Sequence, residues 1–229
     1  MEQRKGTDRQ IQQKKKAAGI FAKAEHYRRN GQGEQALAGY NQALSMVPEH
    51  FGYRLARARY FYNHGNDEAA LIDIDYMLAM QGDNIDALSL KAQVFNARGQ
   101  SQNAIDCYTE ILAINPHRAS IYYNRGYLYY VLGQYNESLQ DLDQACALNS
   151  QLFEAFYYRG LVYLRQGNPY TALDDLLKAR SLKPDSRQVK DALHQLQSEY
   201  QVDTLSRKRK TNQASKLLPF RRTRLNWFS

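Results

Sequence analysis

The sequence predicts an all-α protein, a right-handed solenoid in which five helix–turn–helix repeats stack and a further helix closes the C-terminal end. The prediction depends on columns of residues, meaning positions that recur every 34 residues along the chain. Small residues form one column: Ala24, Ala58, Ala92, Gly126 and Gly160. Three residues later an aromatic column follows: Tyr27, Phe61, Phe95, Tyr129 and Tyr163. A second small column comprises Ala36, Ala70, Ala104, Ser138 and Ala172.

The first expected element is a basic N-terminal extension at residues 1–16, which carries six basic and two acidic residues. We expect roughly its first 14 residues to be a mobile end of the chain. The five repeats follow it directly, at 17–50, 51–84, 85–118, 119–152 and 153–186.

Each repeat is expected to contain two amphipathic helices separated by a glycine turn. In the fourth repeat, helices at 121–132 and 136–148 flank the turn, and the second helix carries apolar residues at helical spacing. Glycine accepts the left-handed conformation that follows a helix, and Pro169 suits the first turn of the next one. Neither helix can bury its apolar stripe alone, so the repeats must stack. The turn glycines form a column of their own: Gly31, Gly65, Gly99, Gly133 and Gly167.

After the fifth repeat, residues 187–204 are expected to form a capping helix. Val189, Leu193, Leu196 and Tyr200 make one apolar stripe, and polar residues occupy the opposite face. Such a helix shields the last repeat from solvent, although a helix reserved for a partner is the alternative. Residues 205–229 form a basic tail that is expected to be disordered.

The columns resemble the tetratricopeptide repeat, whose pattern of aromatic, small and proline positions spans 34 residues. The resemblance covers residues 17–186. The second repeat departs from the pattern most, because Arg54 replaces an aromatic, Met77 replaces Ala and Gly82 replaces Pro. The fifth repeat matches the pattern most fully, with Phe156, Gly160, Tyr163, Ala172, Leu176, Ala179 and Pro184.

The resemblance implies a non-enzymatic adaptor or assembly scaffold that holds a peptide or helical segment of another protein. In this family the first helices of the repeats line a concave groove, so their non-consensus residues are candidate partner contacts. Tyrosine suits this role, since it offers a large contact area, few rotatable bonds and a hydroxyl. Packing of some of these tyrosines between repeats is the alternative. The candidates are Arg28, Arg29, Arg59, Tyr62, Tyr123, Asn124, Tyr127, Tyr130, Tyr157, Tyr158 and Arg165.

One known use of the family is not expected here. Chaperone-binding members hold a terminal carboxylate with Lys and Asn side chains of successive first helices and with a paired Lys and Arg on the third. The column for that Lys holds Ala18, Gly52, Asp86, Ser120 and Glu154. The column for the Arg holds Ala22, Ala56, Leu90, Asn124 and Tyr158. No register supplies this carboxylate clamp.

A basic residue precedes the first small column in every repeat, and acidic residues recur in the second helices. We expect ion pairs between the two helices of a repeat, Arg125 with Asp141 or Arg159 with Asp175, and not acid–base catalysis. Their expected value is orientation of the helices more than net stability. The basic column is Lys23, Arg57, Lys91, Arg125 and Arg159.

The basic tail gives the chain much of its net charge of +8 and contains no acidic residue. A solubilising role is one interpretation. The other is an electrostatic contact to nucleic acid, an anionic membrane surface or an import receptor, and this makes a tail-led binding protein the alternative function. Its basic residues are Arg207, Lys208, Arg209, Lys210, Lys216, Arg221, Arg222 and Arg224.

Catalytic, metal and cofactor sites are not expected. The histidines lack the spacing of zinc ligands, and the sequence has no Gly-rich phosphate loop, HExxH motif or nucleophile elbow. Cys107 and Cys146 are expected to be buried free thiols. The apolar runs are too short to span a membrane, and the N-terminus has no apolar signal region, which favours the cytoplasm. The cluster at 207–210 makes the nucleus the alternative if the source is eukaryotic.

Overall fold

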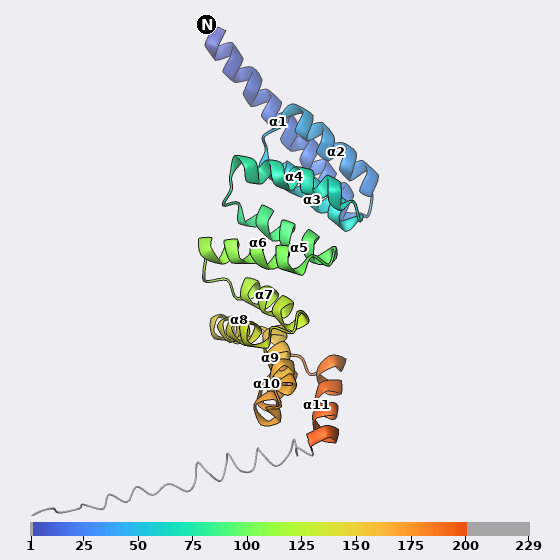
Figure 1. Ribbon diagram of the computed structural model, residues 1–229. Coiled ribbons are helices and arrows are strands. Elements are labelled where there is room, and N and C mark those ends of the chain that lie inside the picture. The colour runs from blue at the N-terminus through green and yellow to red at the C-terminus, as the bar shows by residue number, and fades with distance from the viewer. Residues whose placement is uncertain (1, 201–229) are drawn as a thin grey trace, which may run out of the picture. The chain divides into compact units, whose positions relative to one another are not determined.

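The computed structural model describes residues 2–200, and the predicted tail at 205–229 lies outside them. The described residues form eleven α-helices and contain no strand, as the sequence predicts for an all-α repeat protein (Figure 1). They fall into two compact units, which are divided after Gln134, the first with α1–α7 and the second with α8–α11. The helices are α1 (Glu2–Arg29), α2 (Gly33–Met46), α3 (Phe51–Asn63), α4 (Asp67–Met80), α5 (Ile85–Ala97), α6 (Ser101–Ile114), α7 (Ala119–Val131), α8 (Tyr135–Leu148), α9 (Phe153–Arg165), α10 (Pro169–Leu182) and α11 (Arg187–Tyr200).

Within each unit, every helix packs on the next one in the chain. In the first unit α3 also contacts α5, so first helices of neighbouring repeats meet directly. The turn glycines between the two helices of each repeat have φ between 72° and 74°, which is the left-handed conformation that the sequence predicts. Pro169 lies in the first turn of α10.

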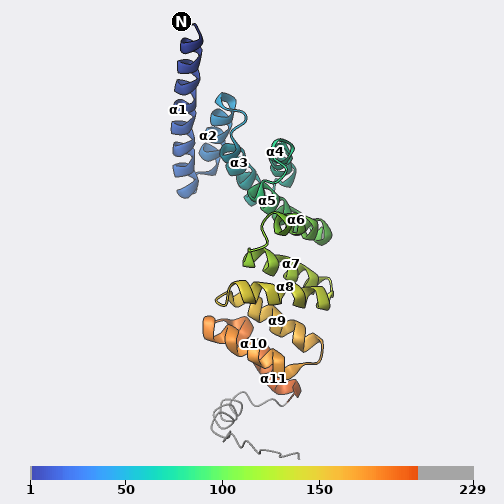
Figure 2. The same ribbon diagram turned by 90° about the vertical axis from the view of Figure 1, so that its left-hand side faces the viewer.

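The first helix differs from the prediction of a mobile N-terminal end. Helix α1 begins at Glu2 and extends well past α2 (Figures 1 and 2). Residues 9–18 consist almost entirely of Gln, Lys, Arg and Ala, which are strong helix formers, so the first repeat helix continues backward without a stop. The Gln13 side-chain amide also donates a hydrogen bond of 2.9 Å to the Met46 carbonyl at the end of α2.

The small-residue columns lie where the two helices of a repeat approach each other most closely. A Cβ added to Gly160 would lie 3.0 Å from Cγ of Leu176 and 3.3 Å from the Ala172 carbonyl oxygen. In the first repeat a Cβ on Gly39 would lie 2.6 Å from Cβ of Ala24. All three distances are shorter than normal van der Waals contacts of a Cβ atom, so a larger side chain would separate the helices.

Two arginines of the basic column each join three helices. Arg57 pairs with Asp73 through two hydrogen bonds of 2.7 Å. Its Nη1 also donates a hydrogen bond of 2.8 Å to Oδ1 of Asn41 in the preceding repeat. Arg159 repeats the arrangement with two bonds of 2.7 Å to Asp175 and one of 2.8 Å to Asp143. This confirms the predicted pair of Arg159 with Asp175 and adds a link between repeats that the sequence analysis did not include.

Arg54, which departs from the repeat pattern, fills the place of the missing aromatic residue. Its guanidinium lies 3.5 Å from the ring centroid of Tyr76, pairs with Asp73 at 3.0 Å and donates 3.0 Å to the Pro48 carbonyl. Planar guanidinium groups stack on aromatic rings and satisfy several acceptors at once. The substitution therefore keeps the packing of this repeat while changing its chemistry.

Helix α11 covers the last repeat. It packs on α10 and on α9, and it buries Val189, Ala192, Leu193 and Leu196. Tyr200, which the sequence analysis placed in the same stripe, is 40% exposed.

A leucine at Gly160 should lower the thermal midpoint, because overpacking a close helix contact typically costs about 1–3 kcal/mol. Gly19→Ala is the control. Gly19 is an exposed helical residue with no atom within 4 Å of an added Cβ, so this change should stabilise the helix by roughly 0.5–1 kcal/mol. Equal midpoints for Gly160→Leu and the wild type would contradict the packing of α9 on α10.

Asp73→Ala should lower the free energy of unfolding by about 3–5 kcal/mol, since two arginines would lose a buried partner. Asp73 is 1% exposed, whereas Asp75 is 60% exposed in its pair with Lys91. Asp75→Ala should therefore cost less than about 1 kcal/mol. Urea unfolding of both variants makes the comparison, and equal losses would show that burial does not decide the strength of these pairs.

Candidate partner-binding surfaces

A row of tyrosines on α7 forms the candidate surface of the first unit. Tyr123, Tyr127 and Tyr130 have the spacing of one helix face, and all three are half-buried. The ring centroids of Tyr123 and Tyr127 are 6.5 Å apart, and Tyr127 also packs against the core of the third repeat. The row is therefore anchored in the core while part of each ring is exposed. Asn124 is half-buried next to it.

The candidate residues of α3 differ in burial. Tyr62 is half-buried and packs against the core shared by α3, α4 and α5. Arg59 is exposed and, among the residues that the structure describes, forms no ion pair. Tyr62 thus contributes to packing, and Arg59 offers its charge to solvent.

On α1, Arg28 belongs to a small polar network. Its guanidinium donates hydrogen bonds of 2.8–3.3 Å to Glu25, and the Tyr40 hydroxyl donates one of 2.6 Å to the same carboxylate. The bond from Arg28 is the main reason that the pKa of Glu25 lies below its usual value. Burial, followed by the Glu25 carboxylate, raises the pKa of Tyr40. Arg29, one residue on, is exposed.

The second unit has its own aromatic cluster on α9. The rings of Tyr157 and Tyr158 meet edge to face with centroids 5.1 Å apart, and Phe153 stacks on Tyr157 at 6.0 Å. The Lys183 ammonium lies 5.2 Å from the Phe153 ring, within cation–π range. Arg165 is exposed in the last turn of α9.

The predicted contacts are thus divided between the two units. The first unit holds the eight candidates of α1, α3 and α7, and the second unit holds the three of α9. The candidate tail residues Arg207, Lys208, Arg209, Lys210, Arg221, Arg222 and Arg224 lie outside the described part of the chain.

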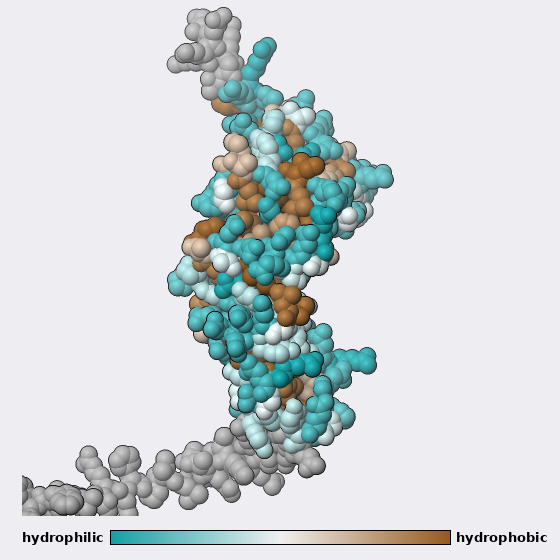
Figure 3. All heavy atoms as spheres, viewed as in Figure 1, coloured by the Kyte–Doolittle hydropathy of each residue, from teal (hydrophilic) through white to brown (hydrophobic). Residues whose placement is uncertain are grey.

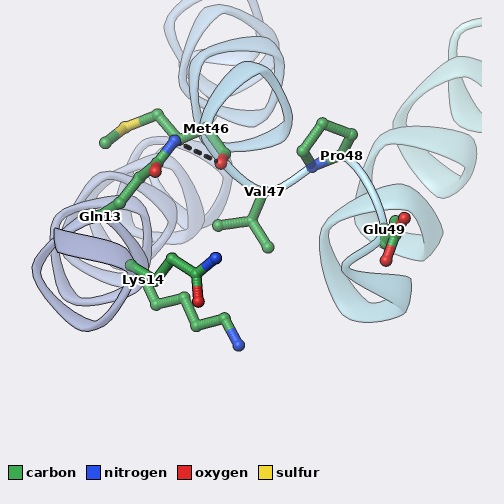
Figure 4. A pocket seen from close by; sticks show the side chains of 7 residues that line it. Gln13, Lys14, Met46, Val47, Pro48 and Glu49 are labelled. Carbon is green, nitrogen blue, oxygen red and sulfur yellow. Dashed lines mark hydrogen bonds between the residues drawn. The ribbon is translucent and has the colours of Figure 1, made fainter. Parts of the chain in front are cut away.

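The sequence analysis missed two pockets that α1 forms with the segment 46–53. Figure 4 shows the first of them, in which Gln13 and Lys14 lie across from the segment 46–49. The second, of about 670 Å³, is lined by Lys14, Lys15, Ala18, Val47, Glu49, His50 and Tyr53. The rings of His50 and Tyr53 stack there with centroids 3.6 Å apart. The run of helix formers before Ala18 was the signal for these pockets.

Among the described residues, no group of three or more His, Cys, Asp or Glu residues has the geometry to hold a metal ion. Cys107 and Cys146 are buried free thiols, and burial raises the pKa of each to about 11, which keeps the sulfur protonated at neutral pH. Across residues 2–200, no helix combines the length and the hydrophobicity that a membrane crossing requires.

The exposed hydrophobic residues are dispersed. On the face in Figure 3 they form separate patches among hydrophilic side chains. Helix pairs joined by glycine turns, with half-buried aromatic clusters on first helices, define a helical-repeat protein.

The comparison with protein families identifies the repeat. A model described as a TPR repeat matches residues 92–133 and 126–167, and one described as a tetratricopeptide repeat matches residues 21–85. Together the matches span more than half of the chain, which belongs to the tetratricopeptide repeat family. Members of this family are typically non-enzymatic scaffolds for protein–protein interaction.

Solved structures agree on the fold. The chain is similar to a tetratricopeptide repeat protein from Parabacteroides merdae ATCC 43184, with a TM-score of 0.70, 20% identity, and coverage of 79% of this chain and 72% of the other. MamA from Desulfovibrio magneticus RS-1 has a TM-score of 0.67 and 19% identity, with coverage of 75% of this chain and 97% of the other. YrrB, a TPR protein with an unusual peptide-binding site, has a TM-score of 0.63 and 19% identity, with coverage of 76% of this chain and 90% of the other. A search of curated proteins gave no match.

Proposed function

We propose that this protein is a non-enzymatic adaptor or assembly scaffold that holds a peptide or helical segment of a partner protein on its first helices. The observation that carries the proposal is the half-buried tyrosine row of α7, Tyr123, Tyr127 and Tyr130. These side chains lie at positions where the repeat pattern demands no aromatic residue. The fold alone therefore does not account for them.

The physical character of the row favours protein ligands. A ring that is held against the core has lost most of its rotational freedom before binding, so its contact with a partner costs little additional entropy. Its hydroxyl still pairs with polar groups of a peptide. The α9 cluster of Phe153, Tyr157 and Tyr158 has the same character. Peptide binding in YrrB is a precedent for this use of a similar fold.

The basic tail supports a second candidate function, binding to nucleic acid or to an anionic surface. Eight basic residues in 205–229, without any acid, provide a dense positive charge. Contacts of this kind release counterions and weaken steeply as salt is added. A tyrosine surface that excludes water depends on salt much less.

The double substitution Tyr123→Ala and Tyr130→Ala should abolish partner binding while the fold survives, because truncating an anchor commonly costs about 2 kcal/mol or more, roughly 30-fold in affinity. Tyr127 is left unchanged since it packs against the core. Quantitative pull-down from a lysate of the source organism measures the loss. Tyr170→Ala, at an exposed tyrosine of α10, is the matched control. A partner retained equally by both proteins would contradict the proposal.

Deleting residues 205–229 should leave the tyrosine-dependent partner bound at high salt. With a 30-base-pair DNA duplex as the probe, the intact chain should instead lose affinity steeply between about 50 and 200 mM salt, and the deletion should remove that binding. Fluorescence anisotropy measures DNA binding by the intact chain and by the deletion variant. If the deletion abolishes binding of the pulled-down partner and the tyrosine substitutions do not, the tail-led function replaces the scaffold.

A further inference from the structure

The first repeat has a hollow surface formed by its two helices. A cavity of about 370 Å³ lies on α1 and α2, and we call its lining the end face. Lys23 is the charged residue of this lining, and the others are small, apolar or amide side chains. The end face comprises Ile20, Lys23, Ala24, Tyr27, Gln35, Ala38, Gly39 and Gln42.

In each later repeat, the residue equivalent to Lys23 contacts a second helix that precedes it. The contacted oxygen belongs to a residue 16 positions earlier in the chain. The four contacts are Arg57 Nη1 to Asn41 Oδ1 at 2.8 Å, Lys91 Nζ to Asp75 Oδ1 at 2.9 Å, Arg125 Nη1 to Thr109 Oγ1 at 2.9 Å and Arg159 Nη1 to Asp143 Oδ1 at 2.8 Å. The stacking surface of each later repeat is therefore covered by a helix that places an oxygen acceptor at this position.

Lys23 lacks such a helix. The residue 16 positions before it, Thr7, lies on α1 itself, because α1 is one continuous helix from Glu2. Within the described residues, Lys23 forms no hydrogen bond or ion pair. The surface that receives α2, α4, α6 or α8 in the later repeats is thus uncovered in the first.

The rest of the end face suits a helix as well. Ala38 and Gly39 keep the surface low, so another helix backbone can approach closely. Tyr27 is 36% exposed, whereas the aromatic residues of its column in the later repeats are half-buried. Lys16, one turn before Ile20 on α1, adds a second exposed positive charge.

We propose that the end face binds an amphipathic α-helix of a partner protein, which takes the place of a preceding second helix and presents an aspartate or glutamate to Lys23. Charge distinguishes a partner's acidic helix from the basic tail of this chain as the occupant of the end face. The basic tail of this chain would bring like charge to Lys16 and Lys23, whereas an acidic helix complements them. This surface is distinct from the tyrosine surfaces of the proposed function and does not depend on them.

The test uses a synthetic peptide of residues 66–82 of this chain, which contains α4. In the intact protein this helix covers α5, and its Asp75 pairs with Lys91, the lysine equivalent to Lys23. The peptide is titrated to millimolar concentration into the full-length ¹⁵N-labelled protein, with amide shifts recorded. We expect saturable shifts at Ala38 and Gly39. A peptide with Asp75→Lys should bind about three- to tenfold more weakly, and Lys23→Glu in the protein should restore its affinity.

Two control variants make the outcome decisive. Ala38→Glu, at an exposed position, should eliminate the shifts, and Tyr123→Ala should leave them unchanged. Absence of shifts at millimolar peptide, or equal binding to Ala38→Glu, overturns the proposal. If the shifts of Ala38 and Gly39 depend on protein concentration without peptide, and Ala38→Glu removes that dependence, the occupant is a second copy and the proposal is wrong. None of these outcomes bears on the tyrosine surfaces.

Discussion

Stacking in the second and fifth repeats depends on an arginine that the first helix places between two second helices. Arg57 and Arg159 each connect the second helix of their own repeat with that of the repeat before. The two contacts differ in environment, since Asp175 is 8% exposed and Asp143 is 52% exposed. The inner contact is a buried, doubly hydrogen-bonded pair that is costly to break. The outer one contributes direction more than stability. One side chain therefore fixes both the closure of a repeat and its alignment with the repeat before it.

This constraint makes the two ends of the repeat series different. At the C-terminal end, α11 supplies an apolar stripe for the fifth repeat and turns polar residues outward. At the first repeat, α1 continues straight instead of folding back as a helix hairpin, so no equivalent cover exists among the described residues. The N-terminal extension lies against the end of α2 through Gln13 and leaves the end face uncovered. An uncovered stacking surface has the geometry of a helix-binding site, because the fold itself uses that surface to bind helices.

The sequence predicted most of the fold because its columns report contacts that every repeat must make. Positive φ at the turn glycines and the burial of Ala58, Ala92 and Gly160 follow directly from the columns. The helical N-terminal extension was missed, since the repeat pattern stops at residue 17 and says nothing of helix propensity before it. Arg54 was predicted only as a departure from the pattern. Its stacking on Tyr76 depends on a neighbour in another helix, which no local pattern identifies.

The sequence predicted which residues of the candidate surfaces share a helix face, but not how they pack. Helical spacing places Tyr123, Tyr127 and Tyr130 on one face, but it does not reveal how far each ring packs into the core. The pair of Arg28 and Glu25 is local, since the two residues are three positions apart on α1, whereas the hydrogen bond from Tyr40 to Glu25 depends on tertiary structure.

The division between constant and variable columns explains where binding can evolve in such a protein. Stacking requires the small, aromatic and basic columns, so a change there alters the fold before it alters a ligand contact. Other first-helix columns carry no such requirement, and their chemistry varies freely from repeat to repeat. The column of Tyr127 runs Glu25, Arg59, Gln93, Tyr127 and Leu161. A charge, an amide, a phenol and an aliphatic side chain thus occupy equivalent places on one scaffold. Because stacking requires no single residue type in these columns, the variable columns are where the structure can specify a partner.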